Sequence, residues 1–439
     1  MTQRLAAVIM AAGLGTRMKS SLPKHLHPLL GRRLVDWVIE AARQVAPETL
    51  VVVASPEHRD AFAGVAVAVQ ERPLGTGDAV RAARAAVDGA SDLLVLSGDH
   101  PLLTSAALDE LIAAHRAAGA VATVLSFEPP NPRSYGRIVR DGDGSLRGIV
   151  EASDASPEEL AVREVNSSIY VFEAERLWPA LERLEPRNAQ GELYLTDAVR
   201  HLVDAGESVA VHRAADSAEI EGVNTRVELA AAAGALRDRI NEAHMLAGAT
   251  IVDPATTWID ATVILEPDAV IEPFTVLRGT TRVAAGASIG PHAVLVDAQI
   301  GARALVGPFC YVRPGTVLEE GAKAGTFVEL KQAHIGKGAK VPHLAYVGDA
   351  EVGEGANVGA GTVTANLSHK PGVGKRRTKI GRDAKIGIQN SLVAPVEIGD
   401  GSWTAPHSAI TDDVPPDSLA GFPPRQETKE GYVRDTRDD

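Results

Sequence analysis

Residues 257–300 read TWIDATVILEPDAVIEPFTVLRGTTRVAAGASIGPHAVLVDAQI, and an aliphatic residue returns at every sixth position from Ile259 to Leu295. After one step of five residues the period resumes at Ile300 and continues, with further shifts of phase, to Ile410. A period of six fits neither the 3.5-residue repeat of a coiled coil nor the two-residue repeat of a sandwich strand. The pattern therefore predicts a hexapeptide-repeat parallel β-helix with the aliphatic side chains stacked inside.

One segment interrupts this period. Residues 367–378 contain Gly, Pro and the cations Lys370, Lys375, Arg376 and Arg377, so they must leave the coil as a loop. Composition alone allows two interpretations of this basic loop on an acidic chain: it binds an anionic ligand, or it is simply solvated.

The residues before about 223 follow a different pattern. β-Branched runs near 50–54, 65–70, 93–97 and 121–127 alternate with Ala- and Leu-rich segments near 34–44, 76–87 and 105–118. This alternation predicts an α/β sheet with parallel strands, interrupted by a hairpin over 136–140 and 147–151. Residues 226–246 are rich in Ala, Leu, Glu and Arg without proline, which predicts one helix that joins the two halves.

Composition limits the partners. A length of 439 residues predicts two or three domains. The net charge of −13 argues against nucleic acid or an anionic membrane as the main partner. The lone Cys310 excludes an internal disulfide and is expected to be a packed small side chain rather than a nucleophile. We interpret the apolar run 5–12 as a buried strand rather than a signal peptide. With no apolar stretch near the ~18 residues of a transmembrane helix, we expect a cytoplasmic protein.

The first strand leads into Met10-Ala11-Ala12-Gly13-Leu14-Gly15-Thr16-Arg17-Met18, and Lys24 follows shortly after. Glycines let backbone N–H groups approach phosphates closely, and a guanidinium and an ammonium neutralise them. A glycine turn that serves packing alone remains an equal interpretation of this segment on its own.

Further polar side chains stand at the ends of predicted elements. Gln70 precedes the glycine turn Leu74-Gly75-Thr76-Gly77, a place suited to an amide that faces a nucleobase. Asp99 follows Ser97-Gly98 and is a candidate Mg²⁺ ligand, or else a helix cap. Gly136, Glu151, Asn166 and Asn224 add polar groups at other element ends.

The β-helix carries polar side chains that its fold does not need. Arg313 and Lys331 supply two cations for a phosphate. A histidine can accept the proton of an amine that attacks a thioester, which makes His343 a candidate general base. Tyr346 and Asn357 follow on successive turns of the repeat.

Together these segments resemble, over nearly the whole chain, the bifunctional bacterial enzymes N-acetylglucosamine-1-phosphate uridylyltransferase / glucosamine-1-phosphate N-acetyltransferase. The most specific motifs are the glycine loop, the stretch from Gln70 to Gly77, and Asn188-Ala189-Gln190-Gly191-Glu192-Leu193-Tyr194-Leu195-Thr196-Asp197. The resemblance implies a Rossmann-like uridylyltransferase domain (1–225), a linker helix (226–248), a left-handed β-helix acetyltransferase domain (249–423) and a flexible tail (424–439).

The resemblance also implies roles for residues of the first half. Arg17 and Lys24 hold the UTP phosphates, Gln70 reads uracil, and Asp99 and Asn224 bind Mg²⁺. Gly136, Glu151 and Asn166 contact the N-acetylglucosamine moiety. The whole nucleotide and sugar site comprises Met10, Ala11, Ala12, Gly13, Lys24, Gln70, Gly75, Thr76, Ser97, Gly98, Asp99, Gly136, Glu151, Asn166 and Asn224. Ser168 departs from the family, which often has glycine there.

For the second half, the resemblance makes His343 the general base. Glucosamine-1-phosphate is held by Arg313, Lys331, Tyr346, Asn357 and Lys375. Acetyl-CoA is contacted at Ala360, Asn366, Leu367, Ile388 and Pro406. The departures gather on this acyl-donor side, because Leu367 replaces a tyrosine, Ile388 a serine and Pro406 an alanine. Pro423 stands where arginine is usual, with Arg425 close by.

The expected function is therefore acetyl transfer to glucosamine-1-phosphate followed by uridylyl transfer from UTP, in a homotrimer. Three alternatives remain open. In the first, the chain catalyses uridylyl transfer, and the β-helix is only a trimerisation stalk or acts on another acyl donor. In the second, the chain is a sugar nucleotidyltransferase for a different nucleotide or hexose. In the third, it is a scaffold without activity.

Overall fold

The computed structural model describes residues 4–13, 15–132, 134–367, 372–421, 426–430 and 432–435. The chain divides into two compact units, residues 1–236 and 237–439. Within the described residues, no helix has both the length and the apolar character needed to cross a bilayer.

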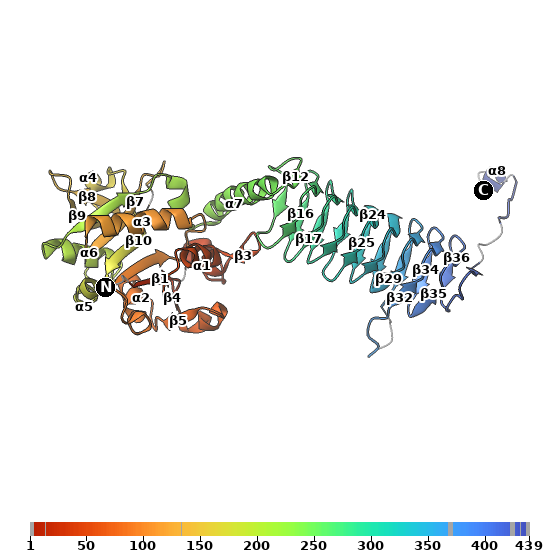
Figure 1. Cartoon of the computed structure of the whole chain (residues 1–439), viewed down its shortest axis with the longest axis horizontal. Coiled ribbons are helices and arrows are strands. Elements are labelled where there is room, and N and C mark those ends of the chain that lie inside the picture. Colours follow the sequence, from red (N-terminus) through yellow and green to blue (C-terminus); the bar gives the residue numbers. More distant parts are fainter. Residues whose placement is uncertain are drawn as a thin grey trace. The chain divides into compact units, whose positions relative to one another are not determined.

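A mixed sheet forms the centre of the first unit (Figure 1). Its strand order is β11-β7-β10-β6-β1-β4-β5, with the hairpin β8–β9 attached to β10. The bounds are β1 (Leu5–Met10), β4 (Thr49–Ala54), β5 (Ala66–Val69), β6 (Asp92–Ser97), β7 (Ala122–Phe127), β8 (Arg137–Arg140), β9 (Leu146–Val150), β10 (Val165–Glu173) and β11 (Val209–Arg213).

The prediction of a parallel sheet is wrong for β10, which runs antiparallel to both β6 and β7. A parallel neighbour needs a crossover of a dozen or more residues, usually a long helix. Between β7 and β10 the chain instead forms the hairpin β8–β9 and the single helical turn α4 (Pro157–Leu160). The chain therefore returns with its direction reversed.

Helices cover both faces of this sheet. The core on one face includes α1 (Leu34–Gln44) and α3 (Ser105–Ala118), and the core on the other includes α2 (Thr76–Ala82), α5 (Ala174–Glu182) and α6 (Leu195–Asp204). The helix expected over 76–87 is two elements, since α2 ends at Ala82 and a 3₁₀ segment, η4 (Arg84–Val87), follows. The other short elements are η1 (Thr16–Met18), η2 (Lys24–Leu26), β2 (Pro28–Leu29), β3 (Arg32–Arg33), η3 (Pro56–Phe62) and η5 (Ser217–Ile220).

The second unit is the β-helix, whose short strands stack into three parallel sheets (Figure 1). Sheet 1 contains β12 (Thr250–Ile251), β15 (Val270–Ile271), β18 (Ser288–Ile289), β21 (Leu305–Val306), β24 (Lys323–Thr326), β27 (Lys340–His343), β30 (Asn357–Val358), β33 (Lys385–Ile386), β36 (Trp403–Thr404) and β38 (Leu419–Ala420). Sheet 2 contains β13 (Trp258–Ile259), β16 (Val276–Arg278), β19 (Val294–Val296), β22 (Tyr311–Val312), β25 (Glu329–Lys331), β28 (Tyr346–Gly348), β31 (Val363–Ala365), β34 (Ser391–Val393) and β37 (Ala409–Ile410). Sheet 3 contains β14 (Ile264–Leu265), β17 (Arg282–Val283), β20 (Gln299–Ile300), β23 (Val317–Leu318), β26 (His334–Ile335), β29 (Ala350–Val352), β32 (Thr378–Ile380) and β35 (Val396–Ile398).

The six-residue period sets the interior of this unit. Every aliphatic position predicted from Ile259 to Ile410 is buried, and Ile259 pairs with Leu277, so one coil takes three hexads. Cys310 is buried among them, and burial raises the pKa of its thiol to about 11. The thiol is therefore a packed side chain, as expected.

The predicted linker helix is α7 (Arg226–Leu246). Its first half contributes Ala232 and Leu236 to a core cluster of the first unit. Its second half belongs to the β-helix, where Ile240 packs against the core. Asn241 Nδ2 there donates to the carbonyl oxygens of Pro254 (2.9 Å) and Thr257 (3.0 Å). A last short helix, α8, spans Tyr432–Asp435.

Candidate active sites

The glycine loop follows β1 at the carboxyl end of the sheet. Met10, Ala11 and Ala12 are buried, and the loop then turns at Gly15, which has φ +61°. A Cβ added to Gly15 would collide with the Lys24 side chain. Glycine is thus required here both for the backbone conformation and for the close approach of Lys24.

A pocket of about 440 Å³ opens beside this loop. Among the predicted site residues, Ala11, Gly98, Gly136, Glu151 and Asn166 do not line it. Those that do are Met10, Ala12, Gly13, Arg17, Lys24, Gln70, Gly75, Thr76, Ser97, Asp99 and Asn224.

Two cations and two oxygen-bearing side chains converge in this pocket. Lys24 Nζ forms an ion pair with Asp99 and lies 3.0 Å from Asn224 Oδ1. Arg17 donates to the same Asn224 oxygen (2.9 Å) and to Ser134 Oγ (3.0 Å). Arg17 and Lys24 follow β1 and Asp99 follows β6, and the two strands are neighbours. Asn224 joins them because Val223 N donates to the Asp99 carbonyl oxygen (2.8 Å).

Asp99 is ionised in this arrangement. Burial alone would raise the pKa of its carboxyl group, but the charge of Lys24 and the hydrogen bond from His100 hold that pKa well below its usual range. Ser97 Oγ also donates to Asp99 Oδ1 (2.6 Å). The helix-cap interpretation of Asp99 is wrong, because Thr104 caps α3 by accepting a hydrogen bond from Ala107 N (3.2 Å).

Gln70 shapes the second glycine turn. Its Nε2 donates to the carbonyl oxygen of Gly75 and to Asp78 Oδ2, both at 3.0 Å. Gly75 has φ +116°, and an added Cβ would lie 2.6 Å from the carbonyl oxygen of Leu193. The segment 188–197, whose role the residues alone did not reveal, thus forms the wall against which this turn packs.

Gly136, Glu151 and Asn166 form a separate group. Asn166 N donates to the Gly136 carbonyl oxygen (2.8 Å), and a Cβ at Gly136 would lie 3.4 Å from Glu151 Oε2. Thr196 Oγ1 donates to Glu151 Oε1 (3.1 Å), and burial raises the pKa of Glu151. Ser168, which does line the pocket, has φ +62°, so it occupies a conformation that favours glycine.

Sequence reasoning missed His25. This side chain is 5% exposed, lines the pocket and hydrogen-bonds to the backbone of Gly13. Burial and the adjacent Lys24 lower the pKa of His25 to about 4. No sequence signal marks His25, because its burial depends on how η2 places it. Other lining residues that were not predicted include Thr16, Pro73, Ala79 and Glu192.

On the β-helix, the predicted phosphate-binding cations lie on sheet 2. Arg313 pairs with Glu329 (2.9 Å). Lys375, from the basic loop, contacts Lys331 and lowers the pKa of that ammonium. Asn366 Nδ2 lies 3.3 Å from the Tyr346 hydroxyl and donates to Asp349 Oδ2 (2.5 Å). The structure thus brings Lys331 to Lys375, and Tyr346 to Asn366.

His343 lies exposed at the end of β27, at the corner between sheets 1 and 2. Gly361, next to Ala360, donates its N–H to the His343 carbonyl oxygen (3.4 Å). The same corner continues through the following coils, because Gln389 N donates to Ala360 O (2.6 Å) and His407 N donates to Ile388 O (2.9 Å). His343 and the predicted acyl-donor positions Ala360, Ile388 and Pro406 therefore follow one another on consecutive coils. Leu367 is exposed on the neighbouring segment.

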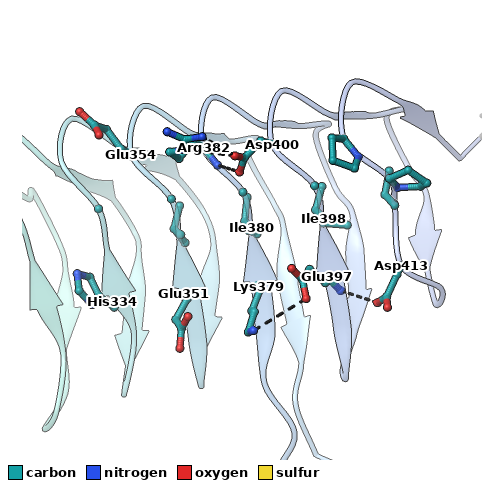
Figure 2. A pocket seen from close by; sticks show the side chains of 18 of the residues that line it. His334, Glu351, Glu354, Lys379, Ile380, Arg382, Glu397, Ile398, Asp400 and Asp413 are labelled. Atoms are coloured by element: carbon teal, nitrogen blue, oxygen red, sulfur yellow. Dashed lines mark hydrogen bonds and ion pairs between the residues drawn. The ribbon is translucent and has the colours of Figure 1, made fainter.

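A groove of about 730 Å³ runs along sheet 3, and no predicted acetyltransferase residue lines it. Figure 2 shows two ion pairs between neighbouring coils of this groove, Arg382 with Asp400 (2.9 Å) and Lys379 with Glu397 (3.9 Å). The predicted acetyltransferase residues lie instead on sheets 1 and 2, at the corner between those two sheets and in the segments that follow the strands of sheet 2. Leu14, Lys370, Pro423 and Arg425 lie outside the described residues.

An α/β unit with a pocket that gathers two cations, followed by a hexapeptide-repeat β-helix, defines a class of two-domain transferases. Residues 7–205 match the family model of the MobA-like NTP transferase domain. The chain is 46% identical over 454 residues to "Bifunctional protein GlmU" of Streptomyces avermitilis. The aligned region covers 98% of this chain and 94% of the relative. It is 47% identical over 453 residues to the protein of that name from Kineococcus radiotolerans (98% and 91%) and 43% identical over 461 residues to that from Mycobacterium tuberculosis (98% and 92%). The chain belongs to the family of bifunctional GlmU proteins. The resemblance and the prediction of a bifunctional transferase are therefore confirmed, as is the fold of a nucleotidyltransferase domain followed by a left-handed β-helix.

Proposed function

We propose that the β-helix acetylates glucosamine-1-phosphate with acetyl-CoA, and that the α/β unit converts the product and UTP into UDP-N-acetylglucosamine and pyrophosphate. The convergence of Lys24, Arg17, Asp99 and Asn224 in one pocket carries the second half of this proposal. On the β-helix, the exposed His343 and the contact of Lys331 with Lys375 support the first half.

Uridylyl transfer at this site needs no general base. The phosphate oxygen of N-acetylglucosamine-1-phosphate is already anionic, attacks the α-phosphorus of UTP and displaces pyrophosphate. Arg17 and Lys24 neutralise the charge that develops on the phosphoryl oxygens. Gln70 reads the uracil, and the group of Gly136, Glu151 and Asn166 holds the sugar. The nucleotide is also bound by five residues that line the pocket: Met10, Ala12, Gly13, Gly75 and Thr76.

Asp99 and Asn224 are suited to Mg²⁺. Asp99 Oδ2 and Asn224 Oδ1 both contact Lys24 Nζ, so the two oxygens converge on one point of the pocket, as the ligands of a cation must. No three His, Cys, Asp or Glu side chains of the described residues gather around one point, and Mg²⁺ accepts a few protein oxygens plus substrate phosphates and water. Bound Mg²⁺ would neutralise phosphate charge and orient the triphosphate.

Acetyl transfer forms a C–N bond and breaks the C–S bond of the thioester. His343 accepts a proton from the attacking amine of glucosamine-1-phosphate, and the thiolate of CoA leaves and takes up a proton. Arg313, Lys331, Tyr346, Asn357 and Lys375 hold the sugar phosphate. Ala360, Asn366, Leu367, Ile388 and Pro406 face acetyl-CoA.

Two assays on one preparation test the proposal. Thiol release from acetyl-CoA with glucosamine-1-phosphate reports the first reaction, and pyrophosphate release from UTP with N-acetylglucosamine-1-phosphate reports the second. We expect both, with UTP preferred over ATP, GTP and dTTP. Pyrophosphate release without thiol release would establish the uridylyltransferase-only alternative. A preference for another nucleotide would support a different sugar nucleotidyltransferase. If neither product is released, the protein is a scaffold without activity.

We infer that the protein is a cytoplasmic homotrimer. A single β-helix offers one wall for acetyl-CoA, so a neighbouring copy is needed to enclose it. An exposed ladder supports self-association: stacked rings of Phe274, His292, Phe309 and Phe327 follow the corner that leads to His343, with centroids 4.7, 4.8 and 5.1 Å apart. Such a continuous apolar ridge is typical of an interface. Light scattering should give a trimer for the wild type and smaller species for Phe309→Asp with Phe327→Asp, whereas a monomeric wild type would overturn this inference.

A further inference from the structure

The outer face of sheet 1 carries a row of side chains that includes three lysines and no carboxylate. Lys323, Lys340, Asn357, Lys385 and Trp403 follow one another in register on consecutive coils. No Asp or Glu stands at an outward position of this row, and among the described residues the three lysines form no ion pair. Sheet 3 is the internal comparison, because Lys379 on its outer face pairs with Glu397 (Figure 2).

The row ends in an aromatic side chain. Trp403 is 54% exposed, and Lys385 Nζ lies 4.7 Å from the centroid of its ring. An exposed indole beside an unneutralised ammonium is the pair of groups that binds a nucleotide, since the ring stacks on a base and the cation attracts a phosphate. On a chain with a net charge of −13, such a local positive site does not arise from overall composition.

The row lies beside the corner that carries the acyl-donor positions. Ala360, Ile388 and Pro406 each come three positions after a member of the row, namely Asn357, Lys385 and Trp403. Because these corner residues stack on consecutive coils, the lysine and tryptophan row runs parallel to them. A ligand that extends along the corner from His343 therefore reaches Lys385 and Trp403 at its far end.

We propose that Trp403 and Lys385 bind the nucleotide end of coenzyme A, with the indole stacked on adenine and the ammonium paired with a phosphate. This inference rests on the proposed acetyltransferase function and supplies contacts on the side where the sequence departs from its family. Ile388 and Pro406 offer no hydrogen-bonding side chain at the corner. The Trp403 indole and the Lys385 ammonium on the adjacent face of sheet 1 provide binding energy for CoA instead of side-chain hydrogen bonds at the corner.

Calorimetric titration of the full-length protein with CoA tests the pair directly. Trp403→Ala should weaken CoA binding about 5- to 100-fold, the range found for loss of one base-stacking contact. Lys385→Met should weaken it about 3- to 10-fold, with a smaller effect at high salt. Lys379→Met, which removes a lysine from sheet 3 in the same region of the β-helix, is the matched control and should leave CoA affinity unchanged.

An acetyl donor that lacks the nucleotide distinguishes a loss of nucleotide binding from a general structural defect. S-Acetylpantetheine has the thioester but no nucleotide, so Trp403→Ala should raise the KM for acetyl-CoA while leaving kcat/KM for S-acetylpantetheine unchanged. The KM for glucosamine-1-phosphate should also stay constant. Equal losses with both donors, or an unchanged CoA affinity in Trp403→Ala, would overturn the assignment of Trp403 and Lys385. If the wild type binds no CoA and releases no thiol, the acetyltransferase function itself fails.

Discussion

Lys24 and Asp99 form an ion pair in the nucleotide pocket, although the two residues come from different elements and their side chains are only 14% and 11% exposed. The pair keeps Asp99 ionised and points its carboxylate into the pocket. Asp99→Asn should therefore lower kcat for uridylyl transfer about 10²- to 10³-fold, because one preorganised charge is lost.

The acetyl-transfer rate of the same Asp99→Asn preparation is its internal control and should not change. Asp92→Asn, at the other end of β6 and paired with Arg116, should affect stability but leave uridylyl transfer within a few-fold of wild type. An Asp99→Asn enzyme with full uridylyl activity would contradict the proposed site.

His343→Ala should lower acetyl transfer about 10²- to 10⁴-fold, the contribution of a general base. Thiol release from acetyl-CoA measures the effect, and pyrophosphate release should be unaffected. The matched control is His334→Ala, an exposed histidine on sheet 3 that pairs with Glu319. If His334→Ala and His343→Ala lose the same activity, His343 has no special role.

Lys375→Met should raise the KM for glucosamine-1-phosphate about 3- to 10-fold with a smaller change in kcat, since an exposed charge–phosphate contact is lost. Removing the Lys375 ammonium also removes the repulsion that lowers the pKa of Lys331. Steady-state kinetics at two salt concentrations distinguish this from a folding defect, because the KM difference should shrink at high salt. A KM that stays at the wild-type value would place Lys375 outside the site.

Protonation of His25 should make the first unit less stable in acid. The pKa of His25 is about 4 in the folded protein, below its ordinary value of 6.5, so the unfolded chain binds the proton more tightly. This stability is complete above pH 6.5 and is lost as the pH falls toward 4, by about 2 kcal/mol between pH 7 and pH 5. In His25→Val the free energy of unfolding should fall less over that range.

Hydrogen exchange of the β1 amides at pH 7 and pH 5 measures this difference in the first unit alone. His343→Ala, which changes an exposed histidine of the other unit, is the control and should keep the wild-type dependence on pH. If wild type and His25→Val lose equal protection, His25 does not carry the effect.

The fold was largely predictable because periodicity reports directly on burial. Ile259, Leu277 and Leu295 share one sheet because three hexads close one coil, so their place inside follows from counting. The direction of β10 was not predictable in this way, since it depends on how the chain returns rather than on residue pattern. The break after Ala82 carries no Gly or Pro signal either.

The nucleotide site was predictable to the extent that it lies at strand ends. Asp99 and the glycine loop meet because Met10 pairs with Ser97, which a general rule of α/β sheets anticipates. His25 could not be anticipated, because only the folded turn buries it. The pairing of Lys385 with Trp403 could have been predicted from the sequence. The two residues are one coil apart, and each comes directly before an inward position of the six-residue period, Ile386 or Thr404.

Asn241 ties the second half of α7 to the first coil of the β-helix, and this contact decides where the chain can be cut. The first coil has no preceding strand to accept its outward backbone groups, so α7 closes that end as a capping element does in repeat proteins. A fragment that starts at residue 249 would lose this cover and expose a strand edge to other chains. Dissecting the protein into separately usable halves therefore requires that the second half of α7 stay with the β-helix, while the first half stays with the α/β unit whose core it completes.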